Sequence, residues 1–229
     1  MPDTPHIVSD VMTVPVVAVG RHARFKEIVR TMGEWRASAL PVLEGDGRVI
    51  GVVSEADLLP KEEFRDRDLT RAEQKRRLSD LAKAGGVTAE ELMSTPAVTV
   101  HPDVTLAQAA RIMAVKHVKR LPVVDDEDRL QGIVSRADLL KVFLRPDEDI
   151  EEEVRRTVVS YLFPALSHAI HVNVREGIVT LRGRVRDTSL VWVAARLTRA
   201  VEGVVDVRTH LTGEPDVSPD APAGPEDTP

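Results

Sequence analysis

The feature that most constrains the fold of this chain is an internal repeat. A shift of 81 residues aligns residues 12–59 with residues 93–140 without a gap, and 17 of the 48 positions are identical. Unrelated sequences would share about three positions, so the two segments are copies of one unit. The recurring landmarks are Met12-x-x-Pro15 and Met93-x-x-Pro96, Leu40-Pro41-Val42 and Leu121-Pro122-Val123, and Gly51–Leu59 and Gly132–Leu140.

Each copy is predicted to fold as strand, helix, strand, strand and helix (βαββα). In the first copy, a short apolar strand at Val16–Val19 precedes apolar residues at helical spacing, which are Phe25, Ile28, Val29 and Met32. Leu40–Leu43 and Val49–Val53 flank a polar, glycine-containing turn, which indicates a hairpin. One such unit cannot easily cover both faces of its small sheet, so we expect an α/β (α+β) fold in which the copies pack as a pseudo-symmetric pair.

The composition excludes several classes of function. The chain has no cysteine, which rules out disulfides and thiolate chemistry and fits a reducing compartment. Of the net charge of −6, residues 213–229 carry five acidic and no basic residues, so the remainder is nearly neutral. That balance argues against a dedicated nucleic-acid-binding protein. With no signal peptide and no apolar run long enough to cross a membrane, we expect a soluble, cytoplasmic protein that is not transmembrane.

The segment between the copies, residues 61–87, is strongly charged. Residues 61–83 hold 14 charged residues of 23, with a thin apolar stripe. We interpret the segment as an exposed helical extension with many salt bridges that ends at Gly85-Gly86. A nucleic-acid-binding helix is the alternative, because basic residues gather at Arg71, Lys75, Arg76 and Arg77.

A third unit is predicted over residues 149–212, with the order αββαβ. An amphipathic helix at Asp149–Phe163 leads to two alternating strands joined by a turn at Glu176-Gly177. A helix from Asp187 to about Val201 and a strand at Val204–Leu211 complete the unit. The proline-rich acidic tail, residues 213–229, is expected to be disordered.

The repeated pattern resembles the CBS domain, named after cystathionine β-synthase. The residues that carry the resemblance are M-(S/T)-x-x-(I/V), L-P-V-(V/L) and G-(I/V)-V-S-x-x-D-(L/I), present in both copies. We assign residues 1–60 and 88–145 to two CBS domains, which together resemble a Bateman module. The resemblance implies a regulatory module that binds an adenosine-containing ligand (ATP, ADP, AMP, S-adenosylmethionine or NAD) in clefts between the copies.

The third unit resembles a BON domain. The pattern V-x-V-x-x-G-x-V-x-L-x-G-x-V, followed by a helix and V-x-G-V-x-x-V, carries this resemblance. Members of that family are associated with envelope, phospholipid or stress functions. The whole chain is similar to CBS–CBS–BON proteins of high-GC bacteria.

The candidate ligand-binding residues lie in the repeated landmarks. Ser54-x-x-Asp57 and Ser135-x-x-Asp138 follow a strand and begin a helix, where they can form a capping box or present a hydroxyl and a carboxylate to a ligand. In the family, the Asp contacts the ribose and the Ser contacts phosphate. The resemblance implies two clefts: one formed by Ser94, Lys119, Arg120, Ser54 and Asp57, and another formed by Thr13, Ser38, Ala39, Ser135 and Asp138.

The two clefts are expected to differ in charge. Lys119-Arg120 stand where family members direct basic residues toward phosphate, and a guanidinium can bind phosphate with two hydrogen bonds. The alternative is that both belong to a solvated strand entrance. The first copy has Ser38-Ala39 at these positions, so phosphate binding is expected in the cleft of Lys119 and Arg120.

Outside the repeat, the sequence offers few candidates for chemistry. Arg182, Arg184 and Arg186 alternate along one strand and either form the solvated face of a sheet or bind an anionic group such as a lipid headgroup or an acidic protein. His168 and His171 lack a third ligand, so we predict no metal site. Because no catalytic motif is recognisable, we expect a protein that is not an enzyme and that requires no cofactor.

The leading hypothesis is therefore a non-enzymatic sensor that binds an adenine nucleotide as a regulatory ligand and relays occupancy to the BON-like unit. The alternatives are the regulatory half of an enzyme, a nucleic-acid-binding CBS protein, and an envelope- or phospholipid-associated stress protein that binds no nucleotide. A homodimer that pairs through helices is also expected, with Leu58-Leu59 and Leu139-Leu140 as the apolar helix starts.

Overall fold

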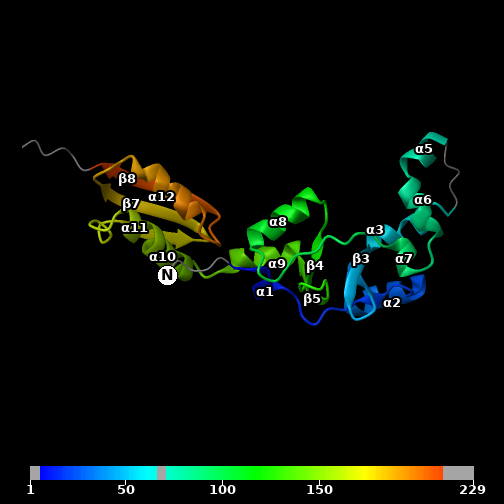
Figure 1. Ribbon diagram of the computed structural model, residues 1–229. Coiled ribbons are helices and arrows are strands. Elements are labelled where there is room, and N and C mark those ends of the chain that lie inside the picture. Colours follow the sequence, from blue (N-terminus) through cyan, green and yellow to red (C-terminus); the bar gives the residue numbers. More distant parts are fainter. Residues whose placement is uncertain (1–5, 66–70, 214–229) are drawn as a thin grey trace, which may run out of the picture. The chain divides into compact units, whose positions relative to one another are not determined.

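The computed structural model describes residues 6–65 and 71–213 and divides the chain into two compact units. One unit lies within Pro5–Lys141 and holds both copies of the repeat, and the other begins at Val142 (Figure 1). The expected disordered tail, apart from Gly213, and part of the inter-repeat segment lie outside the described residues.

The first copy is a three-stranded sheet with helices. Its elements are α1 (Val8–Val11), β1 (Val19–Gly20), α2 (Phe25–Trp35), β2 (Ala39–Glu44), β3 (Arg48–Ser54) and α3 (Glu55–Leu58). β1 pairs with β2 in parallel, and β2 pairs with β3 in the predicted antiparallel hairpin. The strand predicted at Val16–Val19 is shorter and starts later than expected, because only Val19 and the following Gly20 form a ladder with β2.

The second copy repeats this order, except that its leading strand is reduced to a single bridge. Its elements are α7 (Ala89–Leu92), α8 (Leu106–Val115), β4 (Arg120–Val124), β5 (Leu130–Ser135) and α9 (Arg136–Leu140), followed by a 3-10 helix, η1 (Lys141–Leu144). The leading strand is replaced by a single parallel bridge between Val100 and Val123. Both copies therefore have the predicted mixed α/β character.

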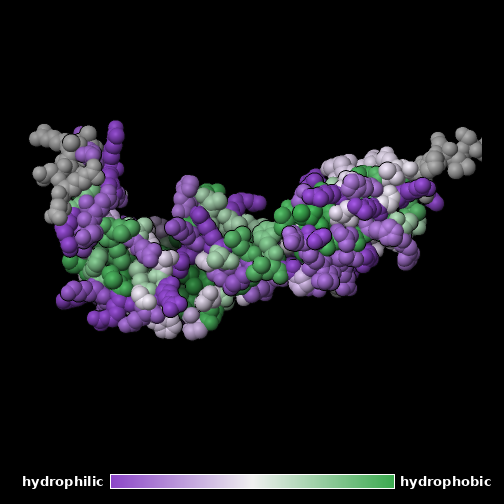
Figure 2. Space-filling view, turned by 180° about the vertical axis from the view of Figure 1, so that it is seen from behind, coloured by the Kyte–Doolittle hydropathy of each residue, from purple (hydrophilic) through white to green (hydrophobic). Residues whose placement is uncertain are grey.

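The helices bury the apolar positions that the periodicity indicates. On α2, Ile28 and Met32 are buried against β2 and β3, whereas Val29 is exposed. The paired leucines, expected at helix starts, lie instead at the C-terminal ends of α3 and α9, and they divide in the same way in both copies. Leu58 and Leu139 are buried, and Leu59 and Leu140 are exposed. The surface of this unit accordingly carries hydrophobic patches between hydrophilic side chains (Figure 2).

The two copies exchange their leading segments. Thr13 forms reciprocal backbone hydrogen bonds with Ile133 of β5, and Ser94 forms the equivalent pair with Val52 of β3. The repeat offset of 81 residues converts one of these pairs into the other. The backbone of Arg48 forms an isolated antiparallel β-bridge with Arg129, which is the equivalent residue of the other copy. This pattern is that of a pseudo-twofold axis that passes between Arg48 and Arg129.

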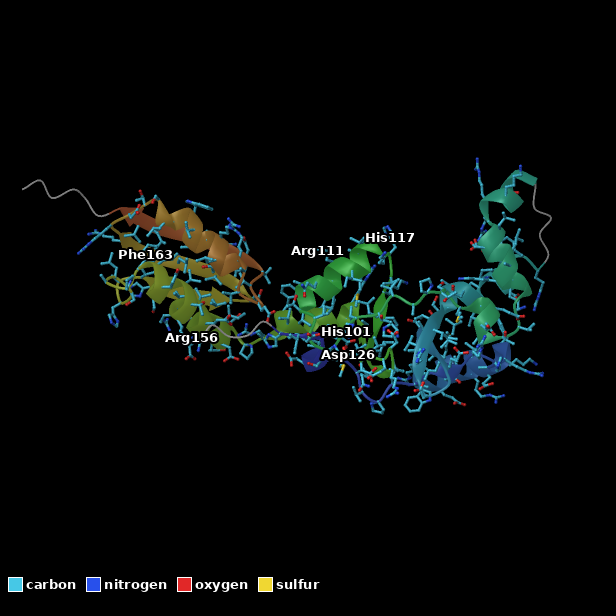
Figure 3. The ribbon with its side chains drawn as sticks, viewed as in Figure 1. His101, Arg111, His117, Asp126, Arg156 and Phe163 are labelled. Carbon is cyan, nitrogen blue, oxygen red and sulfur yellow. The ribbon has the colours of Figure 1, made fainter. Side chains whose placement is uncertain are left out.

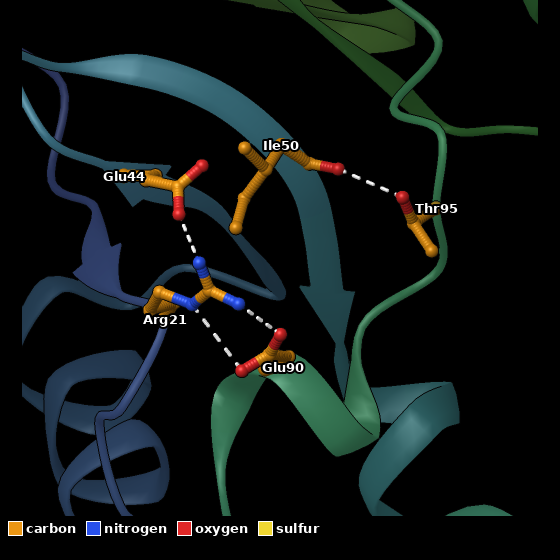
Figure 4. Close-up of polar contacts among 5 residues, drawn as sticks. All are labelled: Arg21, Glu44, Ile50, Glu90 and Thr95. Atoms are coloured by element: carbon orange, nitrogen blue, oxygen red, sulfur yellow. Dashed lines mark hydrogen bonds and ion pairs between the residues drawn. The ribbon is translucent and has the colours of Figure 1, made fainter.

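Side chains reinforce this exchange around α7. Arg21 bonds both Glu44 at the end of β2 and Glu90 on α7, and Thr95 donates its hydroxyl to the carbonyl of Ile50 at 2.9 Å (Figure 4). The contacts with Glu90 hold the pKa of the Arg21 guanidinium above its usual value. They attach the leading segment of the second copy to the sheet of the first.

The described part of the inter-repeat segment is helical, as predicted. It contains α4 (Pro60–Glu63), α5 (Arg71–Arg76) and α6 (Leu78–Gly85), and α6 ends at the expected glycine pair. Salt bridges connect its helices, including those from Arg77 to Glu63 and Asp80. Two further contacts show that this segment is more than an exposed extension. Lys61 donates a hydrogen bond to the carbonyl of Ala84 at 2.9 Å, and Lys83 bonds Asp57.

The second unit is the αββαβ fold expected from the sequence. A helical stretch of α10 (Asp147–Val154), a π-helical turn η2 (Arg155–Val159) and α11 (Ser160–Leu162) precedes β6 (His171–Arg175), β7 (Ile178–Val185), α12 (Leu190–Arg199) and β8 (Asp206–Gly213). β7 lies in the centre of the sheet, antiparallel to β6 and parallel to β8. Alternate apolar residues such as Val172, Val179 and Leu181 pack with Val154 and Val158 of the helical stretch in one buried core.

The turn between β6 and β7 shows why the predicted Glu-Gly pair stands there. Glu176 and Gly177 both have positive φ, 51° and 71°, as a tight two-residue hairpin turn requires. The carboxylate of Asp147 accepts hydrogen bonds from both backbone amides, at 2.7 and 2.8 Å. The start of α10 is thereby tied to the hairpin. None of the helices in the described ranges is both long and apolar enough to cross a membrane.

Candidate functional site

A cavity of about 350 Å³ lies between the two copies of the first unit. Its walls come from the segment before β2, from β3 and α3 in the first copy, and from two segments of the second copy. The lining residues are Ser38, Ala39, Val52, Ser54, Glu55, Ala56, Asp57, Ser94, Pro96, Ala97, Val98, His117, Val118, Lys119 and Arg120. The structure thus brings together all five residues of the cleft that the sequence places around Asp57.

Asp57 forms the acidic end of the cavity. Its side chain is buried, and its Oδ2 atom accepts hydrogen bonds from the Ser54 amide at 2.7 Å and the Ser54 hydroxyl at 2.6 Å. The bond from the Ser54 amide belongs to the predicted capping box at the start of α3. The Oδ1 atom accepts from the Ser94 hydroxyl at 3.2 Å and from the Lys83 ammonium. Residues of both copies therefore orient one carboxylate.

Arg120 forms the basic end. Its guanidinium donates to the Ser38 hydroxyl at 2.6 Å, and its Nε atom is buried with no hydrogen-bond partner. Within the described part of the chain, no carboxylate pairs with Arg120. A guanidinium whose charge has no counter-ion, on the wall of a cavity, can accept an anionic group.

Two further residues surround Arg120. Lys119 is exposed beside it, and its carbonyl accepts the amide of Arg136 at 3.0 Å. His117 follows the end of α8 (Figure 3), has a left-handed conformation with φ of 54°, and is among the residues that line the cavity. Glu55 also lines the cavity, so the charge of the cavity is mixed.

The second predicted cleft is only partly assembled as expected. Thr13 lies beside β5 through its bonds to Ile133, and Asp138 caps α9 by accepting from the Ser135 amide at 2.9 Å and hydroxyl at 2.6 Å. Lys141 donates to Asp138 Oδ1 at 2.8 Å. Burial raises the pKa of Asp138, but the hydrogen bonds from Lys141 and Ser135 outweigh it, so this pKa lies below its usual value.

Ser38 and Ala39 differ from the expectation. The sequence interpretation assigned them to the cleft of Ser135 and Asp138, but both line the cavity of Asp57 and Arg120. The physical reason is the long side chain of Arg120, which reaches from the second copy to the Ser38 hydroxyl. Arg120 and Ser38, which stand one position apart in the register of the repeat, therefore belong to one site.

The sequence interpretation did not identify Lys83. It was placed in an exposed charged helix, whereas its ammonium contacts Asp57 and also the Ser94 hydroxyl, at 3.0 Å. The sequence feature that could have indicated its role is its position near the end of the segment, 11 residues before the candidate site residue Ser94. Composition alone gives no reason to prefer it over the other basic residues of that segment.

The candidate residues of the second unit lie on its open sheet face. Arg182 and Arg184 are exposed on β7, and Arg186 is exposed just beyond it. In register with Arg182 are His171 on β6 and His210 on β8, both exposed. Across residues 6–65 and 71–213, no group of three or more histidine and acidic side chains could hold a metal ion.

Comparisons with known proteins agree with this architecture. The CBS domain model matches residues 8–61 and 89–145, and the BON domain model matches residues 146–215. Protein MJ1426 of Methanocaldococcus jannaschii is 29% identical over 154 residues, which cover 60% of this chain and 91% of that protein. The inosine-5'-monophosphate dehydrogenase of the same organism is 29% identical over 136 residues, but this chain spans only 22% of its length.

A solved structure gives the same result for the fold of the repeat. The crystal structure of CBSX2, a CBS-pair protein of Arabidopsis thaliana, in complex with AMP is 27% identical, with a TM-score of 0.53. The similarity covers 61% of this chain and 97% of that chain. This chain therefore belongs to the CBS-domain family, with two CBS domains followed by a BON domain.

Proposed function

We propose that this protein is a regulatory protein rather than an enzyme, and that it binds a phosphorylated adenosine ligand in the cavity between its CBS domains. The observation that carries this proposal is the presence of a carboxylate and a guanidinium in the same cavity. Asp57 offers carboxylate oxygens suited to the two ribose hydroxyls, and Arg120 offers a guanidinium with no carboxylate partner in the described residues. AMP in the complex of the similar CBSX2 pair supports the same ligand class.

The apolar part of the cavity supports an adenine-containing ligand over a bare phosphate. Ala39, Val52, Pro96, Ala97 and Val98 line it. A flat base can pack against such a wall, while the polar residues at the two ends fix its sugar and phosphate. ATP, ADP and AMP are therefore the ligands to compare first, and we propose a cytoplasmic location because these nucleotides are available there.

The test is calorimetric titration of ATP and adenosine into the wild type and Arg120→Ala. Arg120→Ala should weaken ATP binding about tenfold or more while changing adenosine binding little, because only ATP carries phosphate. High salt should narrow the difference between the two proteins, since exposed charge pairs are screened. Arg111→Ala, an exposed arginine on α8, is the matched control. Equal ATP affinities for the wild type and Arg120→Ala would exclude the phosphate site.

We further propose that the BON domain is the output of the sensor and contacts an anionic group. The exposed Arg182 and Arg184 on the open sheet face support this role. Co-sedimentation with phosphatidylglycerol vesicles and with phosphatidylcholine vesicles tests the lipid form of the contact. Arg182→Ala combined with Arg184→Ala should abolish any preference for the anionic vesicles. No preference in the wild type would leave an acidic protein as the remaining partner.

A further inference from the structure

Both oxygens of the Asp57 carboxylate are already occupied by donors of the protein itself. Oδ2 accepts two hydrogen bonds from Ser54, and Oδ1 accepts one from Lys83 and one from Ser94. A carboxylate offers about four acceptor sites in total. A ligand hydroxyl can therefore bind Asp57 only where one of these donors leaves.

Lys83 is the donor that can leave at the lowest cost. The Ser54 bonds cap α3, and Ser94 is fixed by backbone hydrogen bonds with Val52 at 3.1 and 2.9 Å. The Lys83 ammonium, in contrast, is at the end of a flexible four-carbon side chain and regains full hydration when it leaves. It is also partly exposed, with 21% of its side chain accessible, so water can reach it.

We propose that Lys83 is a specificity-determining residue whose ammonium competes with the ribose hydroxyls of a ligand for Asp57, so that ligand binding releases α6. This inference rests on the proposed function. It makes Lys83 the link between the cavity and the inter-repeat helix. The selected ligand class is a nucleoside with a vicinal diol, because two hydroxyls on one carboxylate can replace an ammonium where one cannot.

The packing of α6 explains why the departure of the Lys83 side chain loosens the helix. Every side chain of α6 is at least partly exposed, so polar contacts contribute much of its attachment to the neighbouring segments. Lys83 supplies two of them, to Asp57 and Ser94, and the Ala84 carbonyl accepts a third from Lys61. When Lys83 leaves, the last turn of α6 retains the bond to Lys61.

In the second CBS domain, the lysine that pairs with the equivalent carboxylate comes from the same helical segment. Its carboxylate, Asp138, also takes a lysine on Oδ1, but Lys141 lies three residues away and is 57% exposed. A local lysine cannot couple Asp138 to a distant segment. The coupling through Lys83 is therefore a property of the first domain's carboxylate.

The test compares two nucleosides that carry no phosphate, adenosine and 2',3'-dideoxyadenosine, by calorimetry on the full chain. Lys83→Met keeps the length of the side chain and removes the charge, so it should bind adenosine about tenfold more tightly and dideoxyadenosine unchanged. Lys83→Arg should behave as the wild type does. Lys75→Met removes one charge from an exposed site on α5 and should change neither affinity.

Hydrogen exchange of α6 supplies the second readout. In the wild type, adenosine should accelerate exchange of the α6 backbone amides, and in Lys83→Met exchange should be fast without ligand. Weaker adenosine binding by Lys83→Met, or an equal effect on both nucleosides, would overturn the inference. If the wild type binds adenosine and Lys83→Met changes nothing, Lys83 alone is wrongly assigned. If neither protein binds any adenine nucleotide, the proposed function itself fails.

Discussion

The thioether of Met93 fills the space that a side chain at Gly51 would need. A Cβ atom built at Gly51 would meet the sulfur and Cγ of Met93 and the Ser94 carbonyl. The counterpart Gly132 has the same relationship with Met12. The methionine of each copy therefore packs against the glycine of the other copy, so these two landmarks of the repeat form one contact that occurs twice across the pseudo-twofold axis.

Gly51→Ala is expected to destabilise the CBS unit by about 1–3 kcal/mol, because the added methyl overpacks a tight contact. Urea unfolding of the full chain measures the change. Gly33→Ala is the matched control, since a Cβ there, in the last turn of α2, meets nothing within 4 Å. That substitution should stabilise the protein slightly, because alanine favours a helix more than glycine does. Combining Gly51→Ala with Met93→Ala should cost less than the sum of the two, and strict additivity would contradict the contact.

The stability of the CBS unit should depend on the ionisation of Asp138. Its pKa in the folded protein is below the usual value of about 3.9, because bonds from Lys141 and Ser135 outweigh the effect of burial. The stabilisation is therefore present above the unfolded pKa and is lost as the pH falls through the folded pKa. Urea unfolding of the wild type and Asp138→Asn should show an advantage for the wild type that is constant near neutral pH and shrinks below about pH 4. An advantage that persists undiminished into the acid range would contradict this assignment.

The expected homodimer should depend on the exposed leucines at the C-terminal ends of α3 and α9. Leu59 is 64% exposed and Leu140 is 60% exposed, while Leu58 and Leu139 carry the packing within the unit. Light scattering should give a dimer mass for the wild type at micromolar concentration and a monomer mass for Leu59→Glu combined with Leu140→Glu. Leu78→Glu, at an equally exposed leucine of α6, should remain dimeric. A monomeric wild type would refute the prediction.

Asp147 should contribute to the stability of the BON domain well beyond its own helix. Asp147→Ala leaves the amides of Glu176 and Gly177 without their acceptor and should cost about 1–3 kcal/mol. Asp149→Ala removes an exposed carboxylate from the same turn and should cost much less. Thermal unfolding measures both, and faster exchange of the two amides in Asp147→Ala identifies the cause. Similar losses in both variants would assign the effect to the helix terminus instead.

Much of the fold could be predicted because its signals are local. The hairpins, the capping residues Ser54 and Ser135, and the Glu176-Gly177 turn are each encoded within a few residues. The leading strand of the second copy was overestimated because a strand depends on a partner, and only Val100 is paired there. The contact of Lys83 with Asp57 was not predicted, and Ser38 was predicted in the other cleft, for the same reason. Their partners, Asp57 and Arg120, are 26 and 82 residues away, and side-chain reach over such separations is decided by packing.

Because the leading segments are exchanged, the residues of one sequence repeat are not the residues of one folding unit. Residues 88–94 belong by sequence to the second copy but form their contacts on the first, and residues 7–13 do the reverse. Neither copy is complete without a segment that its own repeat does not contain. The two CBS domains should accordingly unfold as a single cooperative transition, and cleavage of the chain between them should leave two fragments that hold each other folded.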